Sequence, residues 1–306
     1  MFTIISDGGC DFSSNEVREY GVEVIPFYIS FDQENYLKEG IDITKEEYFN
    51  RLQNEKDLFP KTSQPNPNDY IELYRPHLEA GKDILSLTIS SKLSGSHNSA
   101  SIAIETLLED FPERTIKLID SKNVSIGQGV ILKEICRMRK AGYSLEKTAE
   151  TAEKVIDTTR TYFTLDTLEY LKKGGRVGPT TALVGGILGL RPILQIENGE
   201  VSQLDSVRGK KKAMKLIEAA IVHALKENIS KVNVCVGHIC NKEEAESFQT
   251  NIENDLDFMM TNQIAEIGAT IGTHAGPGAI AFTYCRHFEA IELGDEVHDI
   301  RTAAIA

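Results

Sequence analysis

An alternation of short β-favouring runs and amphipathic stretches along the first half of the chain is the feature that most constrains its fold. The β-favouring runs occupy residues 2–5, 22–31, 84–89 and 116–119. A segment with helical signals follows each run, starting near Ser14, Thr44, Ser94 and Ser125. This order favours a mainly parallel, doubly wound sheet with helices on both faces. The sequence therefore predicts an α/β fold.

The second half of the chain predicts a second domain. A chain of 306 residues exceeds the usual size of one compact domain. Two adjacent helical stretches interrupt the alternation before a new β-rich run begins at Thr161, so we place the boundary near residue 160. Beyond it, Asn198 and Gly199 stand between two apolar runs and indicate a β-hairpin, and helices are expected over 210–225 and 242–256. We expect an α/β domain over 1–160 and a second one, with a mixed sheet, over 161–306.

Composition and charge exclude several classes of partner. The chain is 41% hydrophobic and 26% charged, which is typical of a globular protein. Its 46 acidic and 33 basic side chains give a formal net charge of -13, so we expect no nucleic-acid partner. The five cysteines contain no C-x-x-C pair, which predicts neither a disulfide framework nor a zinc site and favours the cytoplasm.

The apolar runs are too short for a membrane span. The first residues carry no basic leader before a long apolar stretch, and the most apolar later run covers only residues 182–190. We therefore expect no integral membrane segment, while a transient membrane contact stays open.

Two segments of the predicted first domain could hold an anion. Residues 90–96, SSKLSGS, follow a strand and open a helix, where free N–H groups attract negative charge and Gly95 permits close approach. Capping by Ser94 or Ser96 is the alternative. Residues 61–67, KTSQPNP, place Thr62 and Ser63 beside two prolines that fix the backbone. There the alternative is a helix N-cap formed by Ser63 or Asn66.

The predicted second domain has two further candidates. Arg176 stands in a Gly-rich loop, where a guanidinium could clamp a carboxylate or phosphate; complementing a helix C-terminus is the alternative. His274 is bracketed by small residues that permit close approach, and a purely structural histidine is the alternative. Asp7 and Asp11 could form a carboxylate pair, but we favour Asp11 as the cap of the helix region that follows it.

Common nucleotide and catalytic motifs are missing from the sequence. It contains no G-x-x-x-x-G-K-S/T loop, no G-x-S-x-G elbow, no H-E-x-x-H helix and no G-x-G-x-x-G after the first strand. We therefore expect no nucleotide site, no metal site and no catalytic residue.

Six segments, taken in order, resemble the DegV family across essentially the whole chain: Ser6-Asp7 with Asp11, TSQP at 62–65, LSGS at 93–96, Asp120-Ser121, LEYLKKGGRV at 168–177 and GTHAGPGA at 272–279. The resemblance implies two α/β domains with one long-chain fatty acid buried between them and no cofactor. It also implies the acyl-binding subunit of a bacterial fatty acid kinase. A separate ATP-binding subunit then phosphorylates the carboxylate, and the acyl phosphate feeds phospholipid synthesis.

The resemblance also implies roles for particular residues. Thr62, Ser63, Ser94, the Gly95 N–H and His274 would bind the fatty acid carboxylate. Arg176 would lie at the mouth of the site and meet the acyl phosphate or the kinase subunit. The chain itself would not be an enzyme.

The chain departs from the family pattern in three places. The usual Asp-Ser-Thr before the first helix is replaced by Gly8, Gly9 and Cys10 after Asp7, which puts a hydroxyl contribution from this loop in doubt. The usual S-G-T-Y turn has His97 as its last residue, which changes the surroundings of the head group. The chain also continues from Arg286 to Ala306, a segment whose acidic residues predict an exposed tail.

Two other functions compete with the carrier. A hydrolase or acyltransferase could use Ser94 as nucleophile and His274 as base, which requires the two side chains within hydrogen-bond reach. A regulatory protein could instead sense a lipid and bind another macromolecule.

Overall fold

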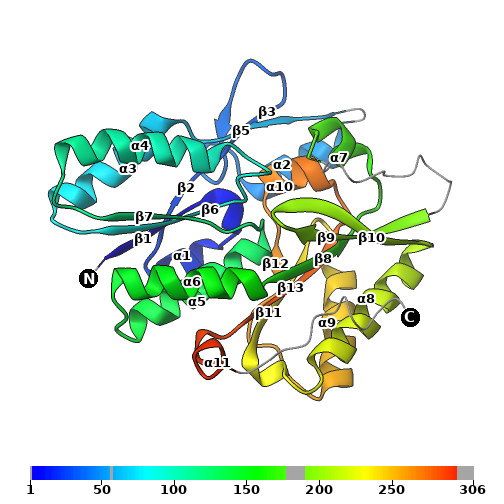
Figure 1. Ribbon diagram of the computed structural model, residues 1–306. Coiled ribbons are helices and arrows are strands. Elements are labelled where there is room, and N and C mark those ends of the chain that lie inside the picture. Colours follow the sequence, from blue (N-terminus) through cyan, green and yellow to red (C-terminus); the bar gives the residue numbers. More distant parts are fainter. Residues whose placement is uncertain (1, 56–57, 177–189, 295–306) are drawn as a thin grey trace.

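The computed structural model describes residues 2–55, 58–176 and 190–294 (Figure 1). A four-stranded parallel sheet with order β2-β1-β6-β7 forms the centre of the first domain. Its strands are β1 (Thr3–Asp7), β2 (Glu23–Ile25), β6 (Ile84–Thr88) and β7 (Ile116–Asp120). Ile4 and Ile5 point to opposite faces, and each joins a different buried cluster.

Helices cover both faces of this sheet. On one face, α3 (Pro67–Glu79) and α4 (Ser96–Asp110) pack against Ile5 and Ile84. The other face packs against α5 (Ile126–Lys140) and α6 (Leu145–Thr158). The short turn η1 (Gly8–Cys10) and helix α1 (Ser14–Tyr20) follow β1. The expected doubly wound parallel sheet is confirmed.

The second domain is built on a six-stranded mixed sheet, as expected, with order β10-β9-β8-β13-β11-β12. Only β11 and β12 pair in parallel, and the other neighbours are antiparallel. The strands are β8 (Arg160–Thr164), β9 (Leu190–Glu197), β10 (Glu200–Arg208), β11 (Val232–His238), β12 (Ala265–Glu266) and β13 (Ile280–Arg286). The helical elements are α7 (Glu169–Gly174), α8 (Lys210–Leu225), η2 (Ile229–Lys231), α9 (Lys242–Leu256), α10 (Ala269–Ala275) and α11 (Phe288–Glu292).

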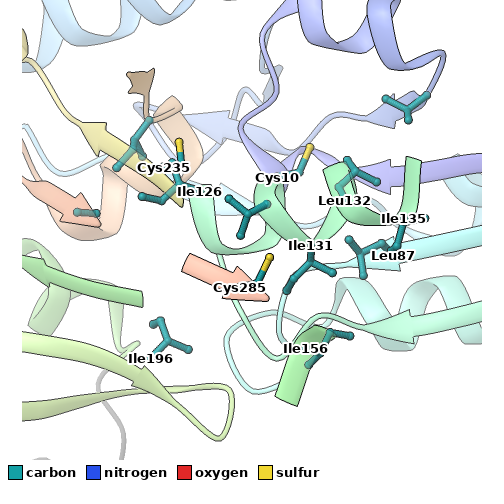
Figure 2. Packing of buried hydrophobic residues seen from close by; sticks show 14 of the residues in the cluster. Cys10, Leu87, Ile126, Ile131, Leu132, Ile135, Ile156, Ile196, Cys235 and Cys285 are labelled. Carbon is teal, nitrogen blue, oxygen red and sulfur yellow. The ribbon is translucent and has the colours of Figure 1, made fainter. Parts of the chain in front are cut away.

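The two faces of this second sheet have different partners. Phe282 and Tyr284 of β13 pack in one core with residues of α8 and α9. Cys285 faces the other way and packs with Ile131 and Ile135 of α5, from the first domain (Figure 2). Helix α5 therefore lies between the two sheets and joins their cores.

A third, antiparallel sheet was not expected. The predicted single strand over 22–31 is wrong, because the chain divides at Pro26, which has no N–H for a sheet ladder. Its first part is β2, and its second part is β3, which pairs with two other short strands in the order β4-β3-β5. These strands are β3 (Tyr28–Ser30), β4 (Leu37–Lys38) and β5 (Lys61–Ser63), with α2 (Lys45–Asn54) between β4 and β5.

Several predicted elements agree closely with the structure. Helices α8 and α9 have the expected bounds, and the β9–β10 hairpin turns at Asn198 and Gly199. Helix α4 begins two residues later than predicted, at Ser96. Val177, Gly178 and most of the apolar run 182–190 lie outside the described residues. Within the described ranges, no helix combines the length and apolarity needed to cross a membrane.

The expectation of an exposed tail after Arg286 holds for Glu289 and Glu292 but is wrong for two of their apolar neighbours. Phe288 and Ala290 of α11 are buried, and the Phe288 N–H donates to the buried carboxylate of Glu134 at 3.1 Å. Apolar side chains within the acidic segment thus dock this short helix on the core. Residues 295–306 lie outside the described part of the chain.

The hairpin turn of the second domain fits directly against the first. Ser90 Oγ donates to the Gly199 carbonyl at 2.7 Å. A Cβ atom added to Gly199 would lie only 2.6 Å from Ser90 Oγ. Gly199 also has a φ of +84°, in the region that favours glycine.

We expect Gly199→Ala to destabilise the protein more than Gly142→Ala does. Gly142 has a similar φ of +87° but has no atom within 4 Å of the added Cβ. Both changes should cost about 1–2 kcal/mol of backbone strain, and only Gly199→Ala should add roughly 1–3 kcal/mol of overpacking against Ser90. Urea unfolding of both variants measures the difference, and equal losses would contradict the contact.

Candidate functional site

A pocket lies between the first domain and the inner face of the second sheet. Its volume is about 220 Å³, whereas roughly 10–15 Å³ holds one water molecule. Mostly apolar side chains line it: Phe27, Ile89, Leu93, Val124, Ile126, Phe163, Leu165, Leu171, Ile196, Val201, Ile267, Ile271, Ala275, Ala279 and Ala281. Strand alternation turns the bulky Ile280 and Phe282 away and leaves the small Ala281 facing the space. The pocket can therefore bury an extended apolar group.

Thr62 and His274 meet at the polar end of this pocket. Thr62 is the central residue of β5, and His274 is on α10, so the pair joins the third sheet to the second domain. Thr62 Oγ1 lies 2.8 Å from His274 Nε2, and both residues line the pocket. The fold thus brings together two predicted site residues that are far apart in sequence.

His274 is neutral at neutral pH. Burial, together with the positive charges of Arg176 and Lys61, lowers the pKa of its imidazole to about 4. Its Nδ1 atom is buried without a hydrogen-bond partner and lies against Gly174 of α7, where a Cβ atom would collide with the ring. A neutral imidazole carries one N–H, which can donate to a carboxylate.

Ser94 and Ser63 line the same pocket, but Gly95 already has a partner. Ser94 Oγ accepts from the Ser96 N–H at 3.2 Å, just before α4 begins. The Gly95 N–H donates to Gln64 Oε1 at 2.9 Å. Ser63 Oγ donates to the Gln64 carbonyl at 3.4 Å and is exposed. The amide of Gln64 thus occupies the N–H that the resemblance assigns to a carboxylate.

Of the two cap alternatives for the helix after this segment, the structure uses Asn66. Its side-chain oxygen accepts from the Asn68 and Asp69 N–H groups at 2.8 and 3.2 Å. Ser63 is therefore not the cap.

The interpretation of Asp11 as a helix cap is wrong. Ser13 caps α1, together with Glu16. Asp11 has a φ of +53°, accepts from Ser125 Oγ of its own domain at 2.5 Å, and accepts from the Gly268 N–H of the second domain at 2.9 Å. Burial raises the pKa of Asp11 to about 6. Asp11 thus forms a hydrogen bond between the two domains.

Arg176 lies at the mouth of the pocket, exposed to solvent. Its Nη1 donates to the Gly174 carbonyl at 2.6 Å and its Nε to the Leu93 carbonyl at 3.3 Å. A smaller neighbouring pocket of about 40 Å³ shares Thr62, Arg176 and His274 and adds Lys61 and Lys173. The outer side of the Thr62–His274 pair is therefore cationic.

Neither His97 nor a metal cluster forms part of this site. His97 Nδ1 lies 3.0 Å from Thr88 Oγ1 and does not line the pocket. In the described ranges, one group of three possible metal ligands was found, Glu134, His287 and Glu289. Arg137 binds both glutamates at 2.6 Å, so a cation of the chain already occupies this cluster.

Sequence reasoning missed Gln64 and the whole inner wall of the second sheet. Gln64 belongs to the TSQP segment, in which the sequence points only to Thr62 and Ser63 as site residues. A signal for the wall exists in β13 and the residue before it, where small Ala279 and Ala281 alternate with bulky Ile280 and Phe282. Small residues on one face of a strand that lies between two cores indicate space beside that face.

Comparison with protein families identifies the chain. The family model described as "Uncharacterised protein, DegV family" matches residues 1–287. The chain belongs to the DegV family. It is 34% identical to a DegV domain-containing protein of Caldanaerobacter subterraneus, over 90% of this chain and 95% of that protein.

Solved structures of DegV relatives share the fold. A protein of Eubacterium ventriosum described as a fat acid (stearic acid)-binding protein has a TM-score of 0.90 and 32% identity, and the match covers 95% of this chain and all of that one. A DegV family protein of Thermus thermophilus, whose description names fatty acid binding, has a TM-score of 0.83 and 30% identity. That match covers 93% of this chain and 99% of the other. The ligands named for these relatives are fatty acids.

The geometry gives no support to a serine nucleophile. His274 Nε2 contacts Thr62 rather than Ser94, and Nδ1 has no carboxylate to orient the ring. A nucleophile of this kind needs a base within hydrogen-bond reach. Ser94 and His274 share a pocket, but no hydrogen bond joins their side chains in the described part of the chain.

We expect His274 to make the ligand-free protein less stable in acid. With a pKa of about 4 in the native state and about 6.5 when unfolded, the imidazole takes up a proton mainly in the unfolded chain as pH falls from 7 toward 4. Relative to His274→Gln, the wild type should lose roughly 2–3 kcal/mol of unfolding free energy over that range. Urea unfolding at pH 7 and pH 4.5 measures this loss.

His223→Gln, at an exposed position of α8, is the control for a general effect of removing a histidine. A difference between wild type and His274→Gln that does not change with pH would show that the native imidazole is not held neutral.

Proposed function

We propose that this protein binds one long-chain fatty acid in the pocket between its domains. The acyl chain lies along the apolar wall, and the carboxylate lies at the Thr62–His274 pair. The observation that carries the proposal is a single pocket that joins an apolar wall to a polar end with positive charges beside it. The stearic acid-binding relative of Eubacterium ventriosum, similar over nearly the whole chain, supports it.

Burial of the acyl chain supplies most of the affinity. Each methylene removed from water contributes about 0.8 kcal/mol, so a long chain contributes on the order of 10 kcal/mol before the costs of association. Most of the described lining is apolar, so polar contacts cannot supply a comparable part of the binding free energy. Affinity therefore depends on the tail, and position depends on the head group.

The head-group end offers donors from three side chains. Thr62 and Ser94 present hydroxyls, and neutral His274 presents an N–H. Arg176 and Lys61 add positive charge on the outer side. The Gly95 N–H becomes a fourth donor when the Gln64 side chain turns away from it. In this proposal Ser63 assists from the exposed side of β5.

We further propose that the bound carboxylate is presented to a separate ATP-binding kinase subunit in the cytoplasm. The chain has no phosphate-binding Gly-Lys-Ser/Thr loop, so the parts that position ATP and Mg²⁺ would come from the partner. Arg176, exposed beside the Thr62–His274 pair, would then contact the acyl phosphate or the partner. The lipid-sensing regulator is the remaining alternative.

We expect the purified protein to release a long-chain fatty acid when it is denatured. The apolar wall would otherwise be left facing water. Mass spectrometry of an organic extract detects the ligand, and binding of added stearate to delipidated protein measures affinity. Absence of lipid together with failure to bind stearate would contradict the proposal.

Ala281→Leu tests where the chain lies, because it fills the pocket from β13. Loss of space for two or three methylenes should weaken stearate binding roughly tenfold or more, while laurate binding changes little. Unchanged stearate binding would place the acyl chain elsewhere, and an equal loss for both acids would show a general effect of the substitution.

We expect Thr62→Val to weaken fatty acid binding about tenfold or more, since a hydrogen bond to a charged group is worth roughly 1.5–3 kcal/mol. Thr270→Val is the matched control: this residue lines the same pocket, but its hydroxyl is buried without a hydrogen-bond partner. Arg176→Ala should bind fatty acid almost normally but fail in phosphorylation assays with the kinase subunit, ATP and Mg²⁺. Equal loss of binding in Thr62→Val and Arg176→Ala would place Arg176 inside the carboxylate site.

A further inference from the structure

Helix α10 supplies a large share of the pocket, although it is only one short segment. Residues 267–275, which are α10 and the two residues before it, line the pocket with Ile267, Thr270, Ile271, His274 and Ala275. The segment lies between β12, at the edge of the second sheet, and β13, near its middle. Whatever fixes α10 therefore also fixes His274 and one wall of the pocket.

Two carboxylates of the first domain bind the start of α10. Glu39, just after β4, accepts from the Ala269 N–H at 2.5 Å and from the Thr270 N–H at 3.0 Å. Asp11 accepts from the Gly268 N–H at 2.9 Å. The first N–H groups of a helix have no partner within it, and negative charge there is favourable.

The helix has no cap of its own. Gly268 stands at the N-cap position and has no side chain that could accept a hydrogen bond. The groups that normally come from a neighbouring residue are delivered here from residues 11 and 39, across the domain junction. Replacing them with water would leave the start of α10 without fixed partners.

The rest of α10 also rests on the first domain. Tyr48 OH lies 2.7 Å from Thr273 Oγ1, and Phe49 lies so close to Gly272 that a Cβ there would be 2.8 Å from its ring. These two aromatic residues belong to α2, the helix between β4 and β5. By chain position α10 is part of the second domain and it packs against α7 of that domain, but its start and its face at Gly272 and Thr273 are held by the first domain.

We propose that Glu39 and Asp11 are positioning residues of the fatty acid site, which hold His274 against Thr62 by capping α10. Glu39 does not line the pocket, so its effect passes through the helix. The inference rests on the proposed function, because it assigns a role within the carboxylate site. It predicts that a residue outside the pocket controls head-group affinity.

Charged groups surround the two caps. Lys45 faces Asp11, lowers its pKa and donates from Nζ to the Glu266 carbonyl at 2.6 Å, whereas Glu39 raises the pKa of Asp11. The positive charges that face His274 at the other end of α10 are those of Lys61 and Arg176. Replacing Glu39 by glutamine therefore removes a capping charge without altering the charges nearest the head group.

The test is a double-mutant cycle on delipidated full-length protein with stearate as the probe. Glu39→Gln should raise the Kd about five- to tenfold, because one side-chain oxygen and the charge are lost while the size is kept. In a His274→Gln background, the same change should raise the Kd less than twofold. Glu16→Gln, which changes a capping carboxylate of α1 away from the pocket, is the matched control and should leave the Kd within twofold of wild type.

The cycle separates failure of the inference from failure of the proposed function. If His274→Gln alone leaves the Kd unchanged, the proposed carboxylate site fails and the positioning role fails with it. If His274→Gln weakens binding but Glu39→Gln does not, only the positioning role is overturned. If Glu39→Gln costs the same in both backgrounds, its effect is general stability and the role is again overturned.

Asp11→Asn keeps the test decisive if Glu39→Gln does not fold. It should raise the Kd in the wild-type background and have little effect beside His274→Gln. Equal effects in the two backgrounds would overturn the role of Asp11 as well.

Discussion

The loops around the pocket depend on one buried carboxylate, that of Asp7 at the end of β1. It accepts from the Ile89 N–H at 3.0 Å after β6, from Ser96 Oγ at 2.6 Å at the start of α4, and from Gln128 Nε2 at 2.9 Å on α5. Burial raises its pKa, and these donors oppose that rise. A buried charge is tolerated only when it is well hydrogen-bonded, so loss of one loop would leave the carboxylate with too few donors.

The hydrogen bonds of Asp7 fix the loops at one edge of the first sheet, and the second domain supplies the rest of the site. Ligands of doubly wound sheets collect outside the carboxyl ends of the strands, which is where Ser94 lies. The wall opposite comes from β8, β9 and β13, and the small Ala281 of β13 leaves space there. Without the second domain, the turn before α4 would face solvent and could bind an anion only weakly, because water screens exposed charges. The space between the domains makes the head-group contacts part of an apolar binding site.

Local patterns predicted local structure well, and long-range contacts account for most of what they missed. The periodicity of α8 and α9 and the Asn198-Gly199 turn depend on neighbouring residues, so the sequence was sufficient for them. The third sheet requires β3 to pair with a strand more than thirty residues away, and Asp11 requires Gly268 of the other domain. The assignment of Thr62 and His274 to one site came from family resemblance, since nothing in their spacing brings them together.

The charges around His274 would allow an otherwise acidic protein to hold the fatty acid anion that we propose as its ligand. The net charge of -13 disfavours anions at long range, yet Lys61, Lys173 and Arg176 gather beside the Thr62–His274 pair. Arg176 and Lys61 help keep the imidazole neutral, so the pocket offers donors while the positive charge stays at its mouth. A carboxylate that enters the pocket approaches these cations and raises the pKa of His274, since opposite charge nearby favours the protonated form. Anion binding thus relieves the repulsion that keeps the empty site neutral, and the same cations would lie beside a phosphoryl group added to that carboxylate.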